Sequence, residues 1–552
     1  MSDENARTPE MILPGGDNSS PRGKLYWFLR HVREYLAHAV RHHWLICTIS
    51  VLVLIFLMVG TRAFYHHAFL QLWKMSFLIL VCVVFGALLK WVHLVHRFIH
   101  FSWKKKIAVG IPLAALVCSV VFWGYDSYWY VALWYRYTTL KIVDVDLLPL
   151  TDFDRALPRQ VIVTSIKQTM HDSSVQTSIP SHVRLKENLY GWSYAILPGD
   201  RLGLRLAGNI RKVGFLPSHS QKLNIETATE DVCFSTAENL LFGKNTRTAT
   251  IWSFSPWRFF RYEPEQIFFV KDDSGKWVQV VSLKKWKAFP FPVAVFGGVQ
   301  VIPQDCHGFL YDAMRVFKGA GYFIPAEEVH KHKFLHGQNT LADSISVHIG
   351  ESFRFQNGFT VPMLTHRGDI RFPVFPDDLN QMPYTMFFRF DNVAIEDKLI
   401  DFIAFEPYNR DLHGYNTSLY IPSDGTPIVY RYRHADKGEA YVGYSAISGY
   451  VQQSRPTNDW TSTTRAVEHR PYHKKFNGKH IPFTLTTVVV IDPKDKGKMT
   501  ASGKPYSVIT YPIVEGYSIW LESDMSHWDE EIALKFKDLL PVPAVLPPTE
   551  QE

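Results

Sequence analysis

The 552-residue sequence lacks the short motifs that most often identify an enzyme. It has no Gly-x-Ser-x-Gly turn, no phosphate-binding P-loop, no Gly-x-Gly-x-x-Gly and no Cys-x-x-Cys. Those motifs position a nucleophilic serine, cradle phosphates or dinucleotides, or hold redox thiols and haem. Their absence removes the usual sequence signs of serine hydrolases, nucleotidases, dinucleotide enzymes and thiol oxidoreductases, so the sequence does not name a reaction.

Cysteine is also scarce, with five residues in the chain. Cys47, Cys82 and Cys118 lie in long apolar segments, where cysteine behaves as a small packing residue. Cys233 and Cys306 are the two that remain. In an oxidising compartment they could form one disulfide, and two separate buried thiols are the alternative.

The soluble part of the chain has no excess of positive charge. Residues 1–141 contain 15 Lys and Arg against 6 Asp and Glu, a net +9, whereas residues 142–552 contain 44 against 46, a net −2. A nucleic-acid-binding domain requires a basic face, so we expect no nucleic-acid partner. Basic residues gathered around apolar segments instead fit a lipid bilayer as partner.

Three long apolar runs are present near the N-terminus. They predict transmembrane helices at about 44–64, 70–92 and 107–126, each close to the ~20 residues that a crossing needs. A polar, disordered tail is expected over 1–21, followed by an interfacial helix over 22–43 that leads into the spans. The spans contain few polar residues, which favours an anchor over a pore.

Basic residues fix the expected orientation. The segment before the first span and the loop between spans two and three hold most of them, while the first loop holds only Arg62 and Lys74. The positive-inside rule therefore places the N-terminus in the cytoplasm and everything after residue 141 outside. In a bacterium this is an inner-membrane protein with a periplasmic domain.

The region after residue 141 is expected to be α+β, with a mostly antiparallel, β-rich fold and a few helices. Runs of Val, Ile, Tyr, Phe and Thr separated by turn residues predict strands at 161–166, 276–283, 293–302, 385–390, 428–433, 441–451, 484–491 and 506–514. Start and stop residues predict helices at 307–318, 325–336 and 526–540. We place a first module at 142–290, a larger one at 291–540 and a Pro-rich tail at 541–552.

One candidate metal site lies in the predicted helix 325–336. Glu328, His332 and His336 have the spacing i, i+4, i+8, which puts them on one helical face. Carboxylate and imidazole groups are suitable ligands for a divalent metal. The alternative is an ordinary solvated helix face, and no other cofactor is expected.

Two further segments are candidate functional sites. The segment from His434 to His480 is predicted as a long loop in which His469, Arg470, His473 and Lys475 could contact an anionic glycan, a lipid head group or a partner protein. A loop without a ligand is the alternative. The sequence His366-Arg367-Gly368-Asp369 could support acid–base chemistry or simply form a tight turn.

Two functions fit these observations. The first is a non-enzymatic, membrane-anchored extracytoplasmic protein of the cell envelope that binds a partner protein or an envelope polymer within a membrane assembly. The alternative is a membrane-tethered, metal-dependent hydrolase that acts on an envelope component. That alternative rests on the histidine clusters alone.

Overall fold

The structure is a computed structural model, and its chain divides into two compact units, Met1–Arg62 and Ala63–Glu552. The second unit is called the body below. The structure describes residues 30–31 and 44–540 without 78, 81, 85, 88–89, 91–128, 152–158, 160–161, 164–165, 167–173, 187–188, 219–228, 307–314, 316, 361–365, 367, 376–381, 392–397, 409–413, 440, 461–463, 491–505, 512–516 and 522–526.

The first long element is helix α2, Trp44–Lys74. It covers the first predicted span and continues through residues 65–69, which were predicted as a loop. Among the described residues, no helix is long and apolar enough for a membrane crossing. The third predicted span, the tail 1–21 and nearly all of 22–43 lie outside the described residues, and the second span is described only in part.

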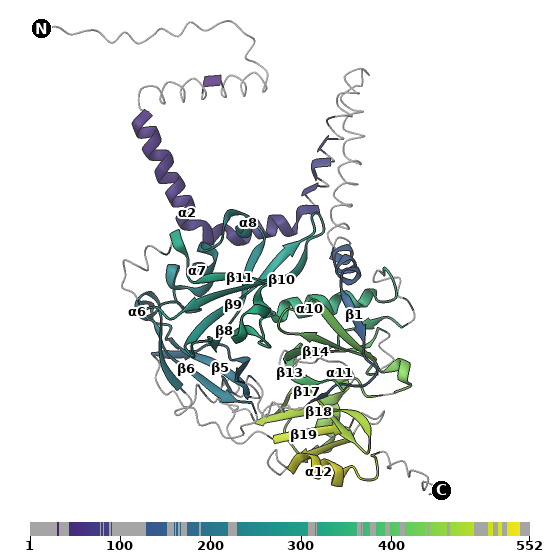
Figure 1. Cartoon of the computed structure of the whole chain (residues 1–552). Coiled ribbons are helices and arrows are strands. Elements are labelled where there is room, and N and C mark those ends of the chain that lie inside the picture. Colours follow the sequence, from purple (N-terminus) through teal and green to yellow (C-terminus); the bar gives the residue numbers. More distant parts are fainter. Residues whose placement is uncertain are drawn as a thin grey trace, which may run out of the picture. The chain divides into compact units, whose positions relative to one another are not determined.

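Two of the sheets in the body lie side by side (Figure 1). One has the order β11-β10-β9-β8, with bounds Tyr322–Pro325, Val293–Pro303, Trp277–Lys287 and Tyr262–Lys271. The other has the order β3-β5-β6-β7 with β4 paired to β5, and its strands are Val175–Thr177, Leu189–Pro198, Ile210–Pro217, Thr229–Phe234 and Ser181–Lys186. All pairs in both sheets are antiparallel.

Three short helices border these sheets: α6 Leu202–Ala207, α7 Thr246–Trp252 and α8 Pro256–Phe259. The side chain of Asn245 caps α7 by accepting from the amide of Thr248 at 3.1 Å. Pro256 starts α8, where a missing amide hydrogen costs nothing. The cap and the proline fix where the chain turns from α7 into α8 and then into β8.

The largest sheet has the order β1-β16-β15-β14-β13-β2, with β12 paired to β14. Its strands are Lys141–Asp144, Ile428–Arg433, Thr417–Pro422, Leu399–Pro407, Tyr384–Arg389, Leu150–Thr151 and Ile370–Arg371. Strand β1 joins β16 in parallel, and the other pairs are antiparallel. Helix α10, Asp343–Ser352, contributes Ile345 and Ile349 to the same apolar core.

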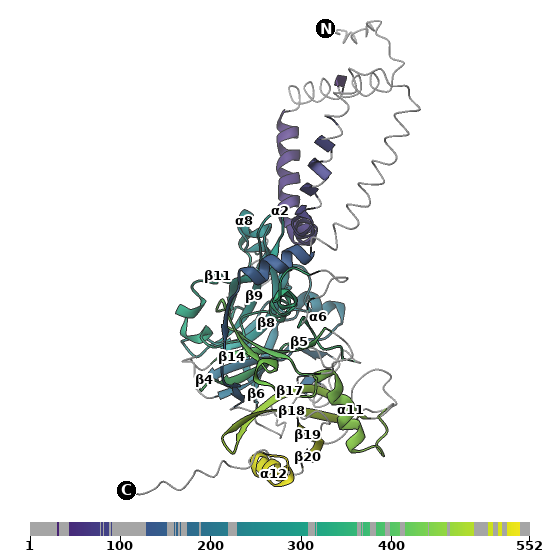
Figure 2. The ribbon, with the colours of Figure 1, turned by 90° about the vertical axis from the view of Figure 1, so that its right-hand side faces the viewer.

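The C-terminal sheet has the order β17-β18-β19-β20, with bounds Thr464–Phe476, Lys479–Val490, Tyr506–Tyr511 and Tyr517–Leu521. Helix α11, Tyr444–Ser454, and helix α12, Trp528–Lys535, pack on it. Within the body, α12 lies at the end opposite to α8 in both views (Figures 1 and 2).

The prediction of an α+β fold with mostly antiparallel sheets and few helices is confirmed for the described residues. Two predicted strands are wrong. Residues 441–451 fall mainly in α11, and the described residues of 161–166 are helical. The predicted helix 325–336 consists instead of two short 3-10 turns, Val329–Lys331 and Lys333–Leu335.

The predicted boundary between modules at 290/291 lies at the turn between two paired strands. Strands β9 and β10 form ten residue pairs from Lys287↔Val293 to Val278↔Pro303. Residues on both sides of that boundary therefore share one sheet, and both lie in the single compact unit Ala63–Glu552.

Candidate functional site

The three predicted metal ligands do not share a helix face. Glu328 precedes the first 3-10 turn, His332 separates the two turns, and His336 follows the second. The apolar side chains of this segment, Val329 and Leu335, are buried in the core under β10 and thereby hold the irregular backbone in place. Across the described part of the chain, no three His, Cys, Asp or Glu side chains come close enough together to hold a metal ion.

The four residues of the predicted ligand-contact loop lie on a strand instead of a loop. His469, Arg470, His473 and Lys475 all lie on β17, and the first three are completely buried while Lys475 is exposed. The register of β17 against β18 shifts between Val467 and Arg470. Such a bulge interrupts the alternation of inward and outward side chains and turns adjacent polar residues into the core.

Each of the buried groups on β17 has a polar partner. His473 Nδ1 lies 3.0 Å from the carbonyl oxygen of Pro149, and His469 Nδ1 lies 2.9 Å from Thr486 Oγ1. Burial lowers the pKa of His469 and of His473 to about 3. Both rings are therefore neutral core residues near pH 7, which removes them as contacts for an anionic ligand.

The turn at His366–Asp369 is structural. The carboxylate of Asp369 is buried and accepts the amide hydrogen of His366 at 2.7 Å. Gly368 has φ +84°, a left-handed conformation that glycine adopts without strain. Asp369 thus stabilises the turn to which it belongs. The ring of His366 is on the surface, with its Nδ1 3.8 Å from Oδ2 of Asp369.

One arrangement of catalytic residue types was not predicted from the sequence. Ser418 lies on β15 and His434 directly follows β16. His434 Nε2 lies 2.9 Å from Ser418 Oγ, and His434 Nδ1 lies 3.2 Å from a carboxylate oxygen of Glu439. Serine, histidine and carboxylate in this order are the groups of a nucleophilic triad. The spacing of five residues between His434 and Glu439 is visible in the sequence. The position of Ser418 beside His434 depends on the register between β15 and β16, which the sequence does not show.

The serine and the histidine of this Ser–His–Glu group are completely buried, and Glu439 is half-buried. Ser418 and His434 have no exposed surface, and the ring of Tyr415 stacks on His434 at 4.1 Å between centroids. Burial lowers the pKa of His434, although Glu439 opposes the shift. Because no substrate carbonyl can reach the hydroxyl, we assign this group to the stability of the fold.

We expect Ser418→Ala to destabilise the body by about 1–3 kcal/mol, because it leaves the buried His434 Nε2 without its partner. Denaturant unfolding of the solubilised chain would measure this loss. A fluorophosphonate probe, which labels activated serines, should give no label on the wild-type chain. Labelling of wild type that disappears in the variant would make Ser418 a nucleophile.

The end of α2 is part of the body. Residues 66–76 contact α8, the β8–β11 sheet and the turn between β9 and β10. The ring of His66 lies 4.9 Å from that of Phe259 on α8, and Leu70 lies in a cluster with Trp286. Lys74 forms an ion pair with Glu263 at 3.3 Å, and Ser76 donates to the Pro290 carbonyl at 3.0 Å. Both His66 and Leu70 are buried. The chain is therefore fixed to the body just before residue 77.

A second helical segment, residues 129–138, fixes the chain again. Its aromatic side chains contact α10 and the turn that follows it: Trp129 on His348, Tyr130 on Phe355, Trp134 on Phe359 and Tyr137 on Phe353, with ring centroids 5.2, 6.3, 5.9 and 5.4 Å apart. Strand β1 follows directly and pairs with β16. The chain therefore contacts the body on both sides of residues 78–128, at Phe77, whose ring stacks on Phe291 with centroids 5.0 Å apart, and at Trp129.

The structure joins Cys233 to Cys306 by a disulfide, with 5.6 Å between their Cα atoms. The bridge links β7 to the segment that follows β10, where Ser235 and Asp305 are also joined by a backbone hydrogen bond of 3.1 Å. Among the described residues, Cys82 is a free cysteine. The bridge therefore connects the two sheets of the N-terminal half of the body.

Comparison with families of proteins, with curated proteins and with solved structures found no match for this chain.

Proposed function

We propose that this chain is a membrane-anchored extracytoplasmic protein of the cell envelope, whose body binds a partner protein or an envelope polymer within a membrane assembly. The observation that carries the proposal is the packing of residues 66–76 and 129–138 on the same body. Both ends of the stretch between them must then lie on one side of a membrane, which requires an even number of crossings.

The length and composition of that stretch suit two crossings. Residues 77–128 number 52, enough for two helices of roughly 20 residues and a connecting loop. The basic residues in the middle of the stretch, Arg97 and Lys104–Lys106, suit a cytoplasmic loop. The charge-free run Trp44–Gly60 supplies a third crossing and leaves the N-terminus in the cytoplasm.

The disulfide supports an extracytoplasmic body, because such bonds persist mainly in oxidising compartments. The buried serine and histidine of the Ser–His–Glu group and the dispersed Glu328, His332 and His336 give no support to a hydrolase. A binding or assembly role therefore has more support than the metal-dependent alternative.

Protease protection tests the orientation. The chain would carry one epitope tag at each terminus and would be expressed in the inner membrane of a bacterium. Protease would then be added to spheroplasts of these cells. We expect loss of the C-terminal tag and survival of the N-terminal tag, in a fragment that resists extraction by alkaline carbonate. A protected C-terminal tag would place the body in the cytoplasm, and complete carbonate extraction would remove the anchor.

The binding role needs its own experiment. Chemical cross-linking in the source membrane, followed by purification through the C-terminal tag, should recover the chain with a stoichiometric partner protein or a covalently attached envelope polymer. Recovery of the bare chain after cross-linking would contradict the assembly role while leaving the membrane anchor intact.

A further inference from the structure

One end of the body exposes a group of large apolar side chains, called the aromatic surface below. Six members with exposed fractions from 37 to 80% belong to it: Phe64 (72%), Phe69 (37%), Leu72 (53%), Trp257 (80%), Phe260 (41%) and Phe289 (60%). They come from α2, from α8 and its C-terminal end, and from the turn between β9 and β10. Isolated exposed apolar residues are common, but a contiguous group of this kind marks an interaction surface.

Ring contacts join these three segments. Phe69 lies 5.4 Å from Phe260, and Trp73 lies 6.0 Å from Phe289, between ring centroids. Beneath them the buried Phe259 lies 6.0 Å from Phe69 and 4.9 Å from His66. Figures 1 and 2 both place α8 beside the C-terminal part of α2. The segments that carry the aromatic surface are therefore packed against one another.

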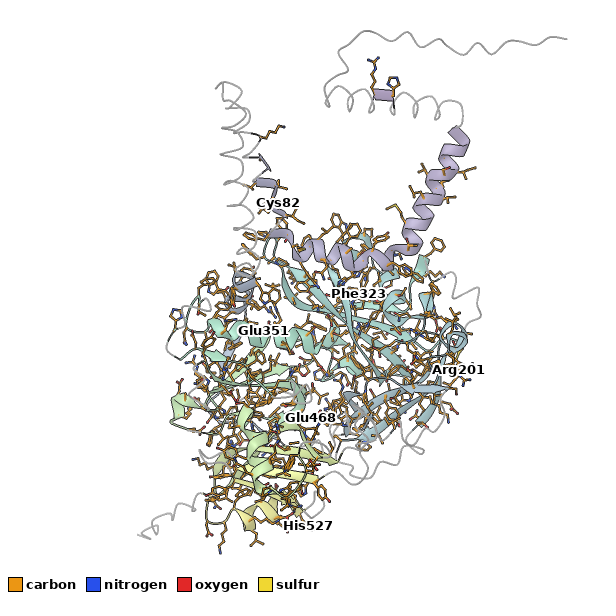
Figure 3. The ribbon with its side chains drawn as sticks, turned by 180° about the vertical axis from the view of Figure 1, so that it is seen from behind. Cys82, Arg201, Phe323, Glu351, Glu468 and His527 are labelled. Carbon is orange, nitrogen blue, oxygen red and sulfur yellow. A yellow bond between two sulfur atoms is a disulfide. The ribbon has the colours of Figure 1, made fainter. Side chains whose placement is uncertain are left out.

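The three segments that carry the aromatic surface contain only basic charges, while the half-buried Glu263 on β8 pairs with Lys74 and Lys284. The segments 63–77, 255–261 and 285–291 contain five basic residues and no Asp or Glu. The guanidinium of Arg261 lies 4.9 Å over the ring of Trp73, and that of Arg258 lies 4.4 Å over Phe323, which Figure 3 labels on β11. Arg261 and Lys287 are exposed. An exposed aromatic surface bordered by cations complements an anionic lipid head-group layer.

The sequence also limits how far this surface can lie from the proposed spans. Phe64 follows the charge-free run that ends at Gly60 by four residues, and Leu72 precedes residue 77 by five, or about 8 Å of helix. Aromatic side chains concentrate at this depth, where one edge of the ring meets water and the other meets hydrocarbon.

We propose that the aromatic surface inserts into the outer-leaflet interface of the membrane that holds the spans, with Arg261 and Lys287 against anionic phospholipid. This inference rests on the proposed function, since it requires the body to lie outside the membrane that its own spans cross. The body is then a monotopic domain seated on lipid, and α12, at the opposite end, faces away from the bilayer (Figures 1 and 2).

Removal of the two exposed cations, Arg261 and Lys287, tests the proposed attraction between the body and anionic phospholipid. Arg261→Gln combined with Lys287→Gln should let a spin label near Trp257 collide more often with a water-soluble nickel chelate in vesicles of phosphatidylglycerol and phosphatidylethanolamine. In uncharged phosphatidylcholine vesicles the same pair of substitutions should change nothing. An equal effect in both lipids would contradict recognition of anionic head groups.

Label accessibility tests insertion itself. The full chain, with Cys47, Cys82 and Cys118 replaced by alanine, would carry a spin label at Trp257→Cys or Phe289→Cys. The matched control is Leu534→Cys on α12, a position 74% exposed. After reconstitution in phosphatidylglycerol and phosphatidylethanolamine vesicles, we expect several-fold fewer collisions with the nickel chelate and more with oxygen at the two test positions than at the control.

Three other results would overturn the inference in distinguishable ways. Equal nickel accessibility at Trp257→Cys and Leu534→Cys, in a chain that resists carbonate extraction, would reject lipid docking and keep the anchor. Shielding from both nickel and oxygen would show that a second copy of the chain covers the aromatic surface. Extraction of the chain by carbonate would reject the anchor and the docking together.

Discussion

Lowering the pH from 6.5 to 5 should destabilise the body by about 3 kcal/mol, through histidines that fold in the neutral form. Burial lowers the pKa of His348, His469 and His473 to about 3 in each case. For His348 the positive charge of Arg136 adds to the effect of burial. All three side chains are buried in the body.

The direction of this change in stability follows from the number of protons that the folded and the unfolded states bind. An unfolded histidine gains a proton below pH ~6.5, whereas these folded histidines gain one only near pH 3, so the unfolded state binds more protons between those limits. Each histidine then lowers stability by up to ~1.4 kcal/mol per pH unit. Asp401 offsets one of the three, because burial and the nearby Asp343 raise its pKa to about 7 and its folded form binds the extra proton.

Denaturant titrations of the solubilised full chain at several pH values, followed by tryptophan fluorescence, would measure this slope. His473→Asn, whose amide can still donate to the Pro149 carbonyl, should reduce the slope by ~1.4 kcal/mol per pH unit, and Asp401→Asn should steepen it by a similar amount. A free energy of unfolding that stays constant from pH 7 to pH 5 would contradict the neutral state of the buried histidines. Identical pH slopes in the wild type, His473→Asn and Asp401→Asn would contradict it as well.

Loss of the Cys233–Cys306 bridge should lower the free energy of unfolding by roughly 4 kcal/mol, because the bridge closes a loop of 73 residues in the unfolded chain. Local hydrogen bonds remain without it, including one from the amide of Cys233 to Gln304 at 3.2 Å. We therefore expect the double variant Cys233→Ser and Cys306→Ser to fold and to unfold at lower denaturant concentration.

The matched control is Cys82→Ser, which removes a free thiol and should leave the midpoint and its response to reductant unchanged. A reductant should shift the wild-type midpoint to that of the double variant. Two results together would show that the native protein lacks the bridge. The wild-type midpoint would be the same with and without reductant, and a thiol reagent would label positions 233 and 306 in the denatured chain.

Strands were predicted best where the sequence alternates or runs apolar between clear turn residues. Strands β9, β10, β16 and β18 follow such runs, and Asn477-Gly478 forms the turn before β18 with φ values of 50° and 81°. The prediction failed at Tyr441–Val451, where aromatic and β-branched residues suggested a strand. Tyr444, Ile447 and Val451 are spaced i, i+3, i+7, and the helix α11 buries all three.

The candidate sites failed for a different reason. A polar segment such as His469–Lys475 looks solvated when only its composition is known, but a bulge and a long pairing with β18 bury most of it. The Ser418–His434 contact depends on the register between β15 and β16, which pairs Ser418 with Tyr432. Registers between strands are tertiary information that a single sequence carries only weakly.

The order of synthesis adds a consequence of the contacts at residues 66–76. This helical segment leaves the ribosome about 200–240 residues before β9 and β10, the strands that cover Leu70 on the body side. Likewise β1 pairs with β16, so Lys141 can form its strand pair only after Ile428 has been synthesised. Contacts so distant in sequence form late in folding. In the proposed topology, the spans would hold an unfinished body at the membrane until most of the chain has been translocated, so that anchoring would act in folding as well as in location.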